Sequence, residues 1–210
     1  NTANYDHAVN TLDTLIKQNK DHARDVLLFV TTLLSTHNYP LNQATISNFG
    51  DYVLNKYSKY PEGYLLASVA YSDTNNQEKL LAVIAQIQHK YPTWEFPVFW
   101  NAGVLVNAAN SPLLGALIDQ EIATRKMPTV NMENLCVSVL IKLNRITDAE
   151  KYVNDSADYK SKAPNMQVNK AVIDYKQGKL DAAAVELQQA KKQGYSLDGA
   201  IDFAIGGILS

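Results

Sequence analysis

Cysteine is almost absent from this chain of 210 residues, and charge of either sign is scarce. The single cysteine, Cys136, excludes an internal disulfide and a cysteine-rich zinc site. Charged residues make up 19% and the net charge is −2, whereas nucleic-acid binding needs a basic surface that displaces phosphate counterions. We therefore expect no nucleic acid among the partners.

Long apolar runs are also missing. No stretch approaches the roughly 18–20 apolar residues that cross a bilayer, so we expect no transmembrane segment in this chain. We expect no signal or transit peptide among these residues, so the sequence assigns no compartment. The sequence opens on Asn1 rather than methionine, and we expect it to belong to a longer chain.

The motifs that carry catalysis are absent as well. The four histidines (His7, His22, His37 and His89) show no metal-ligand spacing, and neither a glycine-rich phosphate loop nor a G-x-S-x-G elbow occurs. Cys136 lies in an apolar stretch without a nearby base, which indicates a buried packing residue. We expect a non-enzymatic protein with no catalytic residue, no cofactor and no metal.

Apolar residues recur at helical spacing throughout the chain, and no alternating pattern typical of strands is present. Turn and capping residues divide the chain into about eleven or twelve helices joined by linkers of two to five residues. Such short linkers force neighbouring helices into antiparallel pairs. The predicted helices span 4–19, 22–37, 42–58, 62–74, 76–90, 95–109, 112–126, 131–143, 147–158, 164–177, 180–193 and 197–209.

A repeat is visible in the turns. Asn76, Asn110, Asn144 and Gly178 lie in successive turns, each 34 residues after the last. A fixed period of this length is typical of stacked helix–turn–helix units, in which no unit buries its own apolar face alone.

The residues of the last unit, 164–191, resemble a tetratricopeptide repeat. Its stretch 175–183 (YKQGKLDAA) is similar to the turn between the first and second helix of that family. Small residues, among them Ala190, fall where two helices of such a repeat meet closely, and we expect four of them to be buried: Gly103, Ala149, Ala171 and Ala183. The opening residues 5–12 look like a second helix whose first helix is missing.

The resemblance implies an all-α fold, a right-handed α-solenoid of stacked antiparallel helix pairs forming one domain over residues 1–210. It also implies a protein–protein interaction module, either scaffold or adaptor, that binds a partner segment in its concave groove. In this family one face of each first helix lines the groove. Helical phasing predicts this groove set: Trp100, Asn101, Asn107, Asn134, Ser138, Lys142, Asn169, Tyr175 and Lys176.

Asparagine is the feature of this groove with the clearest chemistry. An amide offers both a donor and an acceptor, so a row of asparagines can satisfy the backbone of an extended peptide. We expect Asn101, Asn134 and Asn169 to be exposed and to contact a peptide backbone. The alternative is that asparagine is simply common on the exposed helix faces.

Two further features keep a second interpretation open. Ten of the 19 aromatic residues lie between Tyr52 and Trp100, as inter-repeat core or as an aromatic recess for a partner side chain. The first and last predicted helices both leave apolar surface uncovered, which predicts a homo-oligomer or a larger complex formed through the terminal helices. On this interpretation the protein is a structural subunit with permanent contacts.

Overall fold

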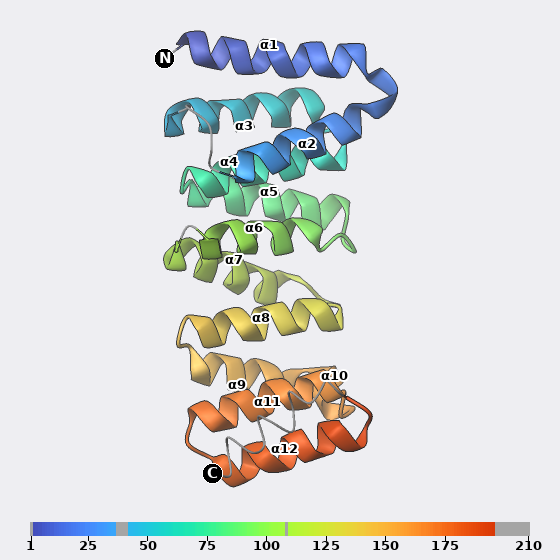
Figure 1. Cartoon of the computed structure of the whole chain (residues 1–210), viewed down its shortest axis with the longest axis vertical. Helices are drawn as coiled ribbons and strands as arrows, with labels where there is room; N and C mark the ends of the chain where they lie inside the picture. Colours follow the sequence, from blue (N-terminus) through green and yellow to red (C-terminus); the bar gives the residue numbers. More distant parts are fainter. Residues whose placement is uncertain (1, 37–41, 108, 196–210) are drawn as a thin grey trace. The chain divides into compact units, whose positions relative to one another are not determined.

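The computed structural model describes residues 2–36, 42–107 and 109–195, with the side chains of 2, 3 and 107 left aside. Helices make up 82% of this described part, which contains no strand. The chain divides into two compact units, Asn1–Arg125 (unit 1) and Lys126–Ser210 (unit 2). The predicted all-α class is confirmed, with antiparallel helix pairs stacked inside each unit (Figure 1).

The described part of unit 1 contains seven α-helices. They are α1 (Thr2–Gln18), α2 (Ala23–Ser35), α3 (Gln43–Tyr57), α4 (Pro61–Asp73), α5 (Gln77–Lys90), α6 (Phe96–Asn107) and α7 (Ser111–Thr124), with the 3₁₀ turn η1 (Lys20–His22) between the first two. Every boundary lies within two residues of the predicted one. Helix α4 is the centre of the core, because it packs on α2, α3, α5 and α6 and is buried from Gly63 to Ser72.

The described part of unit 2 contains α8 (Val130–Lys142), α9 (Ile146–Asp155), α10 (Ala157–Lys160), α11 (Pro164–Lys176) and α12 (Leu180–Lys192). The single turn α10 was not predicted as a separate element. Helix α9 ends at Asp155 because Ser156 is extended (φ −61°, ψ 135°), and its hydroxyl accepts hydrogen bonds from the backbone N–H groups of Asp158 and Tyr159. The predicted helix 197–209 lies outside the described residues.

The turns inside the repeats explain one error in the predicted period. Each of four successive turns has one residue with positive φ: Asn75, Ala109, Asn144 and Gly178. The steps between these residues are 34, 35 and 34 residues and therefore not uniform. Asn76 and Asn110 each follow the positive-φ residue and cap the next helix, accepting from the backbone N–H groups of Lys79 and Leu113. The four turn residues that the sequence made equivalent therefore occupy two different positions.

The extra residue between 109 and 144 shifts the small-residue positions. Ala149, Ala171 and Ala183 are buried as predicted. Gly103 is exposed, and the prediction that it is buried is wrong. With the step of 35 residues, the position equivalent to Ala171 in this repeat is Ala102, which is buried.

Candidate partner-binding surfaces

Unit 2 brings most of the predicted groove residues together on the adjoining helices α8 and α11. We call this surface the amide face; it consists of Asn131, Asn134, Ser138, Lys142, Asn169, Tyr175 and Lys176. Five of these side chains are exposed, and Asn134 and Asn169 are partly exposed. Tyr175 is 49% exposed although it is a large aromatic residue, and the exposed Val172 lies beside it on α11.

Two amides join the helices of this face. Nδ2 of Asn169 donates to Oδ1 of Asn134 across 2.6 Å, from α11 to α8. Among the described residues, no group hydrogen-bonds to Nδ2 of Asn134 or to Oδ1 of Asn169. The pair therefore presents one donor and one acceptor at the surface.

Hydrogen bonds and an ion pair with a charged side chain of α9 hold helix α11 in place. Glu150 of α9 accepts a hydrogen bond of 2.6 Å from Nε2 of Gln177 and lies 3.4 Å from Nζ of Lys170. Lys170 is also paired with Asp174 on its own helix. Hydrogen bonding by Gln177 and then by Lys170 outweighs burial and lowers the pKa of Glu150, so this anchor stays ionised at neutral pH.

Asn101 of unit 1 is not at a surface, and its predicted exposure is wrong. Its side chain is 0% exposed and lies between α6 and α4. Nδ2 donates to Oγ of Ser68 and to the backbone oxygen of Pro97, each at 2.8 Å, and Oδ1 accepts from Ser72. The step of 35 residues explains the error, because it makes Asn101 equivalent to the buried Cys136 of the next repeat.

Trp100 belongs to a continuous row of aromatic rings in unit 1. Ring centroids lie 6.3 Å apart for Tyr64 and Tyr91, 6.0 Å for Tyr91 and Trp94, 6.5 Å for Trp94 and Phe96, and 5.2 Å for Phe96 and Trp100. The row is buried at Tyr64 and 43% exposed at Phe96. Tyr64 and Trp100, at the two ends of the row, therefore lie against the core, and Phe96 between Trp94 and Trp100 is open to solvent.

The last predicted groove residue of unit 1, Asn107, ends α6, and its side chain lies outside the described part. Its position is equivalent to Lys142 and Lys176 in the two following repeats. Trp100 and Asn107 belong to unit 1, and the amide face belongs to unit 2.

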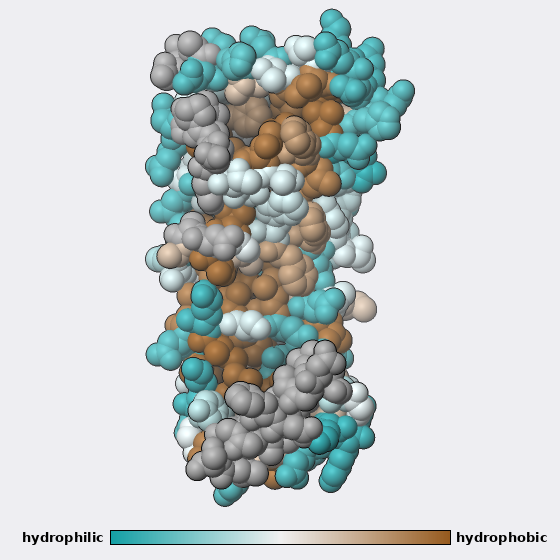
Figure 2. Space-filling model, viewed as in Figure 1, coloured by the Kyte–Doolittle hydropathy of each residue, from teal (hydrophilic) through white to brown (hydrophobic). Residues whose placement is uncertain are grey.

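An apolar groove that sequence reasoning did not predict lies between α1, α2 and α3. It encloses about 570 Å³. Its polar lining residues are Asn4, His7, Thr11 and Thr36, and its apolar ones are Ala8, Leu12, Leu15, Phe29, Val30, Leu33, Leu34, Ile46 and Phe49. Phe29 and Leu33 are 58% and 50% exposed, and Figure 2 shows apolar side chains gathered on this face over α2. We call it the α1–α2 groove.

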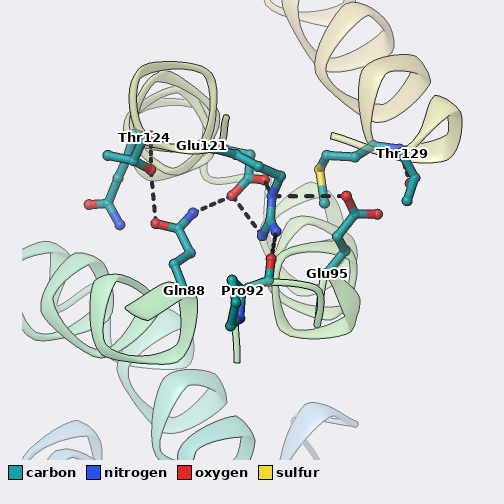
Figure 3. Close-up of polar contacts among 9 residues, drawn as sticks. Gln88, Pro92, Glu95, Glu121, Thr124 and Thr129 are labelled. Carbon is teal, nitrogen blue, oxygen red and sulfur yellow. Dashed lines mark hydrogen bonds and ion pairs between the residues drawn. The ribbon is translucent and has the colours of Figure 1, made fainter. Parts of the chain in front are cut away.

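A buried network of charged side chains at the end of α7 was also not predicted from the sequence. The Arg125 guanidinium pairs with Glu121, lies 3.9 Å from Glu95, and donates to the backbone oxygen of Pro92 at 2.7 Å (Figure 3). Nε2 of Gln88 donates to the same Glu121 carboxylate at 2.5 Å. The network ties α7 to α5 and to the segment before α6, which is a structural role.

No group of three or more His, Cys, Asp or Glu side chains in the described part is placed to hold a metal ion. No described helix combines the length and the apolar character that a membrane span requires. Cys136 is completely buried, as predicted.

No protein-family model matches the chain, and no curated protein sequence matches it. Among solved structures, a tetratricopeptide repeat protein from Parabacteroides merdae ATCC 43184 matches. That match covers 96% of this chain and 100% of the other, with 14% sequence identity and a TM-score of 0.30. The helical-repeat architecture described above rests on this chain's own helices and turns.

Proposed function

We propose that this chain is a non-enzymatic protein-interaction module that binds an extended segment of a partner protein on the amide face of unit 2. Helical-repeat folds are in general protein-interaction scaffolds, because their stacked helices expose extended binding surfaces. The observation that supports the specific surface is the Asn134–Asn169 pair, which offers one donor and one acceptor outward. An extended peptide has the complementary C=O and N–H groups along its backbone.

The neighbouring side chains add selectivity to this backbone contact. Tyr175 and Val172 offer exposed apolar area for a side chain of the bound segment. Lys142 and Lys176 occupy equivalent positions in successive repeats, and both are exposed. Two ammonium groups in register favour acidic residues or a terminal carboxylate in the bound segment.

The test is a selection of binding peptides from a random phage-displayed library on the full chain, followed by affinity measurement for the selected peptides. Replacing Asn134 and Asn169 together by alanine should weaken binding about ten- to a hundredfold, since each lost hydrogen bond is worth on the order of 1 kcal/mol. Asn154→Ala changes an exposed asparagine of α9 outside this face and is the matched control. Equal affinity of the double variant and the control would show that the amide face is not the binding site.

The second candidate function is a structural subunit of a larger assembly. The observation that favours it is the α1–α2 groove, where Phe29 and Leu33 of unit 1 are exposed beside apolar walls. Permanent contacts usually bury such residues.

A further inference from the structure

Three successive rings of the aromatic row in unit 1 expose surface to solvent: Trp94, Phe96 and Trp100. We call them the ring cluster. Phe96 is 43% exposed, and the two tryptophans are partly exposed and pack against the core. The ring of Phe96 lies at 26° to that of Trp94 and at 71° to that of Trp100. Because the core and the neighbouring rings hold each ring in place, a ligand that contacts the cluster orders few side chains.

The other two rings of the row already have a cation beside them. Nζ of Lys90 lies 5.1 Å from the ring centroid of Tyr64 and 5.5 Å from that of Tyr91. Among the described residues, no cation lies over a ring of the ring cluster. Uncharged apolar groups of a ligand can therefore contact its three rings.

The segment that carries Trp94 is fixed by the network around Arg125 (Figure 3). The Arg125 guanidinium donates to the backbone oxygen of Pro92 at 2.7 Å and lies 3.9 Å from the carboxylate of Glu95. The backbone N–H of Trp94 also donates to the backbone oxygen of Tyr91 at 2.9 Å. These contacts hold the backbone on both sides of the Trp94 ring, so the cluster is a preformed surface.

The two indoles of the cluster supply hydrogen-bond donors. Among the described residues, no group accepts a hydrogen bond from Nε1 of Trp94 or of Trp100, and neither nitrogen is one of the buried unpaired atoms of this part. An indole N–H only donates. The neighbouring carboxylate and amide, Glu95 and Asn101, are both buried. The cluster therefore favours a ligand that accepts hydrogen bonds and has few N–H groups of its own.

We propose that the ring cluster binds a proline-rich segment of a partner protein in the polyproline II conformation. Proline has no backbone N–H, so such a segment offers carbonyl acceptors to the two indoles and apolar pyrrolidine rings to the aromatic rings. Prolines three residues apart recur along one edge of this helix about every 9 Å. That spacing suits a row whose successive ring centroids are 6.5 and 5.2 Å apart. The site lies in unit 1 and shares no residue with the amide face, so it is independent of the proposed function.

Tryptophan fluorescence tests this directly. The chain contains only two tryptophans, Trp94 and Trp100, so its tryptophan emission reports on the ring cluster alone. Titration of the full chain with unlabelled decaproline should change this emission in a saturable manner, and calorimetry of the same titration should show a heat of binding. A glycine–serine peptide of the same length is the control and should change neither signal.

Three variants separate the contributions of the rings and of the donors. Phe96→Ala removes the exposed ring but keeps both tryptophans, and it should weaken decaproline binding about tenfold. Phe29→Ala removes a phenylalanine of α2 that is 58% exposed, and this matched control should bind decaproline like the unmodified chain. Trp94→Phe keeps a ring and removes one donor, so binding followed through Trp100 should weaken about three- to tenfold. Circular dichroism checks that each variant is folded.

Three results would overturn the proposal. The first is an emission that stays unchanged at every decaproline concentration, together with no heat of binding. The second is equal decaproline affinity of Phe96→Ala and Phe29→Ala. The third is equal binding of decaproline and the glycine–serine peptide, which would mean that the cluster does not select proline. The Asn134/Asn169 double variant should bind decaproline normally and lose only peptides of the amide face, so failure of this proposal and failure of the proposed function give different results.

Discussion

The hydroxyl of Ser72 donates a hydrogen bond of 2.5 Å to Oδ1 of Asn101, and both side chains are fully enclosed between α4 and α6. Nδ2 of Asn101 is shared between Ser68 and the backbone oxygen of Pro97. The oxygen and the nitrogen of this amide are therefore both hydrogen-bonded inside unit 1. Its role is to fix α6 against α4, since a buried polar group is stable there only when it is paired.

Asn101→Ala should destabilise unit 1 by roughly 1–3 kcal/mol, because the buried hydroxyl of Ser72 loses its acceptor, and that of Ser68, which still donates to the backbone oxygen of Leu65, loses its donor. Urea unfolding followed by circular dichroism measures this change. Asn131→Ala removes an exposed asparagine from α8 and should change stability by less than about 0.5 kcal/mol. A loss for Asn101→Ala no greater than that of Asn131→Ala would contradict the structural role.

Adjacent alanines in α12 provide a matched pair for the packing of unit 2. Ala183 is completely buried near Ala171 and Leu187, whereas Ala182 is exposed. Ala183→Leu should overpack this contact and destabilise the protein by roughly 1–3 kcal/mol, and Ala182→Leu should be nearly neutral. Thermal melts of the two variants check the difference, and equal melting temperatures would argue against the contact.

Gly103 and Gly63 should respond to alanine in opposite directions. A Cβ at Gly103 meets nothing within 4 Å, so Gly103→Ala should stabilise α6 by roughly 0.5–1 kcal/mol through its higher helix propensity. A Cβ at Gly63 would lie 2.4 Å from the backbone oxygen of Tyr57, so Gly63→Ala should destabilise the protein. Unfolding midpoints of both variants in urea test the pair. Destabilisation by Gly103→Ala would indicate that Gly103 is buried, as the sequence predicts, and would contradict the exposed position.

The helices could be predicted because their signals are local. Asn42 and Thr129 cap helices through their own side chains, and Pro61 and Pro164 occupy first positions where a missing N–H costs nothing. The repeat was predictable for the same reason. Its one irregular step was not, since asparagine can occupy either the positive-φ position or the cap that follows it, and both serve the turn.

The candidate surfaces were harder to predict from the sequence than the helices. A phase error of one residue places a side chain about 100° around a helix. That error moved Asn101 from the core to the predicted surface, while the unit 2 residues, whose frame was correct, remain at the surface. The α1–α2 groove depends on α2 packing against α4, and the pattern of residues along one chain does not specify such a long-range choice.

Glu133 of α8 makes the stability of unit 2 sensitive to pH. Burial raises the pKa of this carboxyl above its ordinary value of 4.5; the hydrogen bond from Ser156 partly opposes this, and the nearby Asp158 adds to it. The fold therefore favours the protonated form. The corresponding stability is fully present below pH 4.5 and is lost as the pH rises through the raised pKa, because the unfolded chain releases this proton first.

Glu133→Gln should remove this dependence, because the amide resembles the protonated acid: its oxygen can still accept from Ser156, and its nitrogen can donate to Asp158. We expect the variant to be more stable than the unmodified chain at pH 7, with a difference that shrinks as the pH falls below 4.5. Urea unfolding at a series of pH values measures it. Glu78→Gln, at an exposed position of α5, should show no such trend. A variant that is less stable than the unmodified chain at pH 7 would mean that the Glu133 carboxylate, in its charged form, holds α8 to Ser156 more strongly than its burial opposes it.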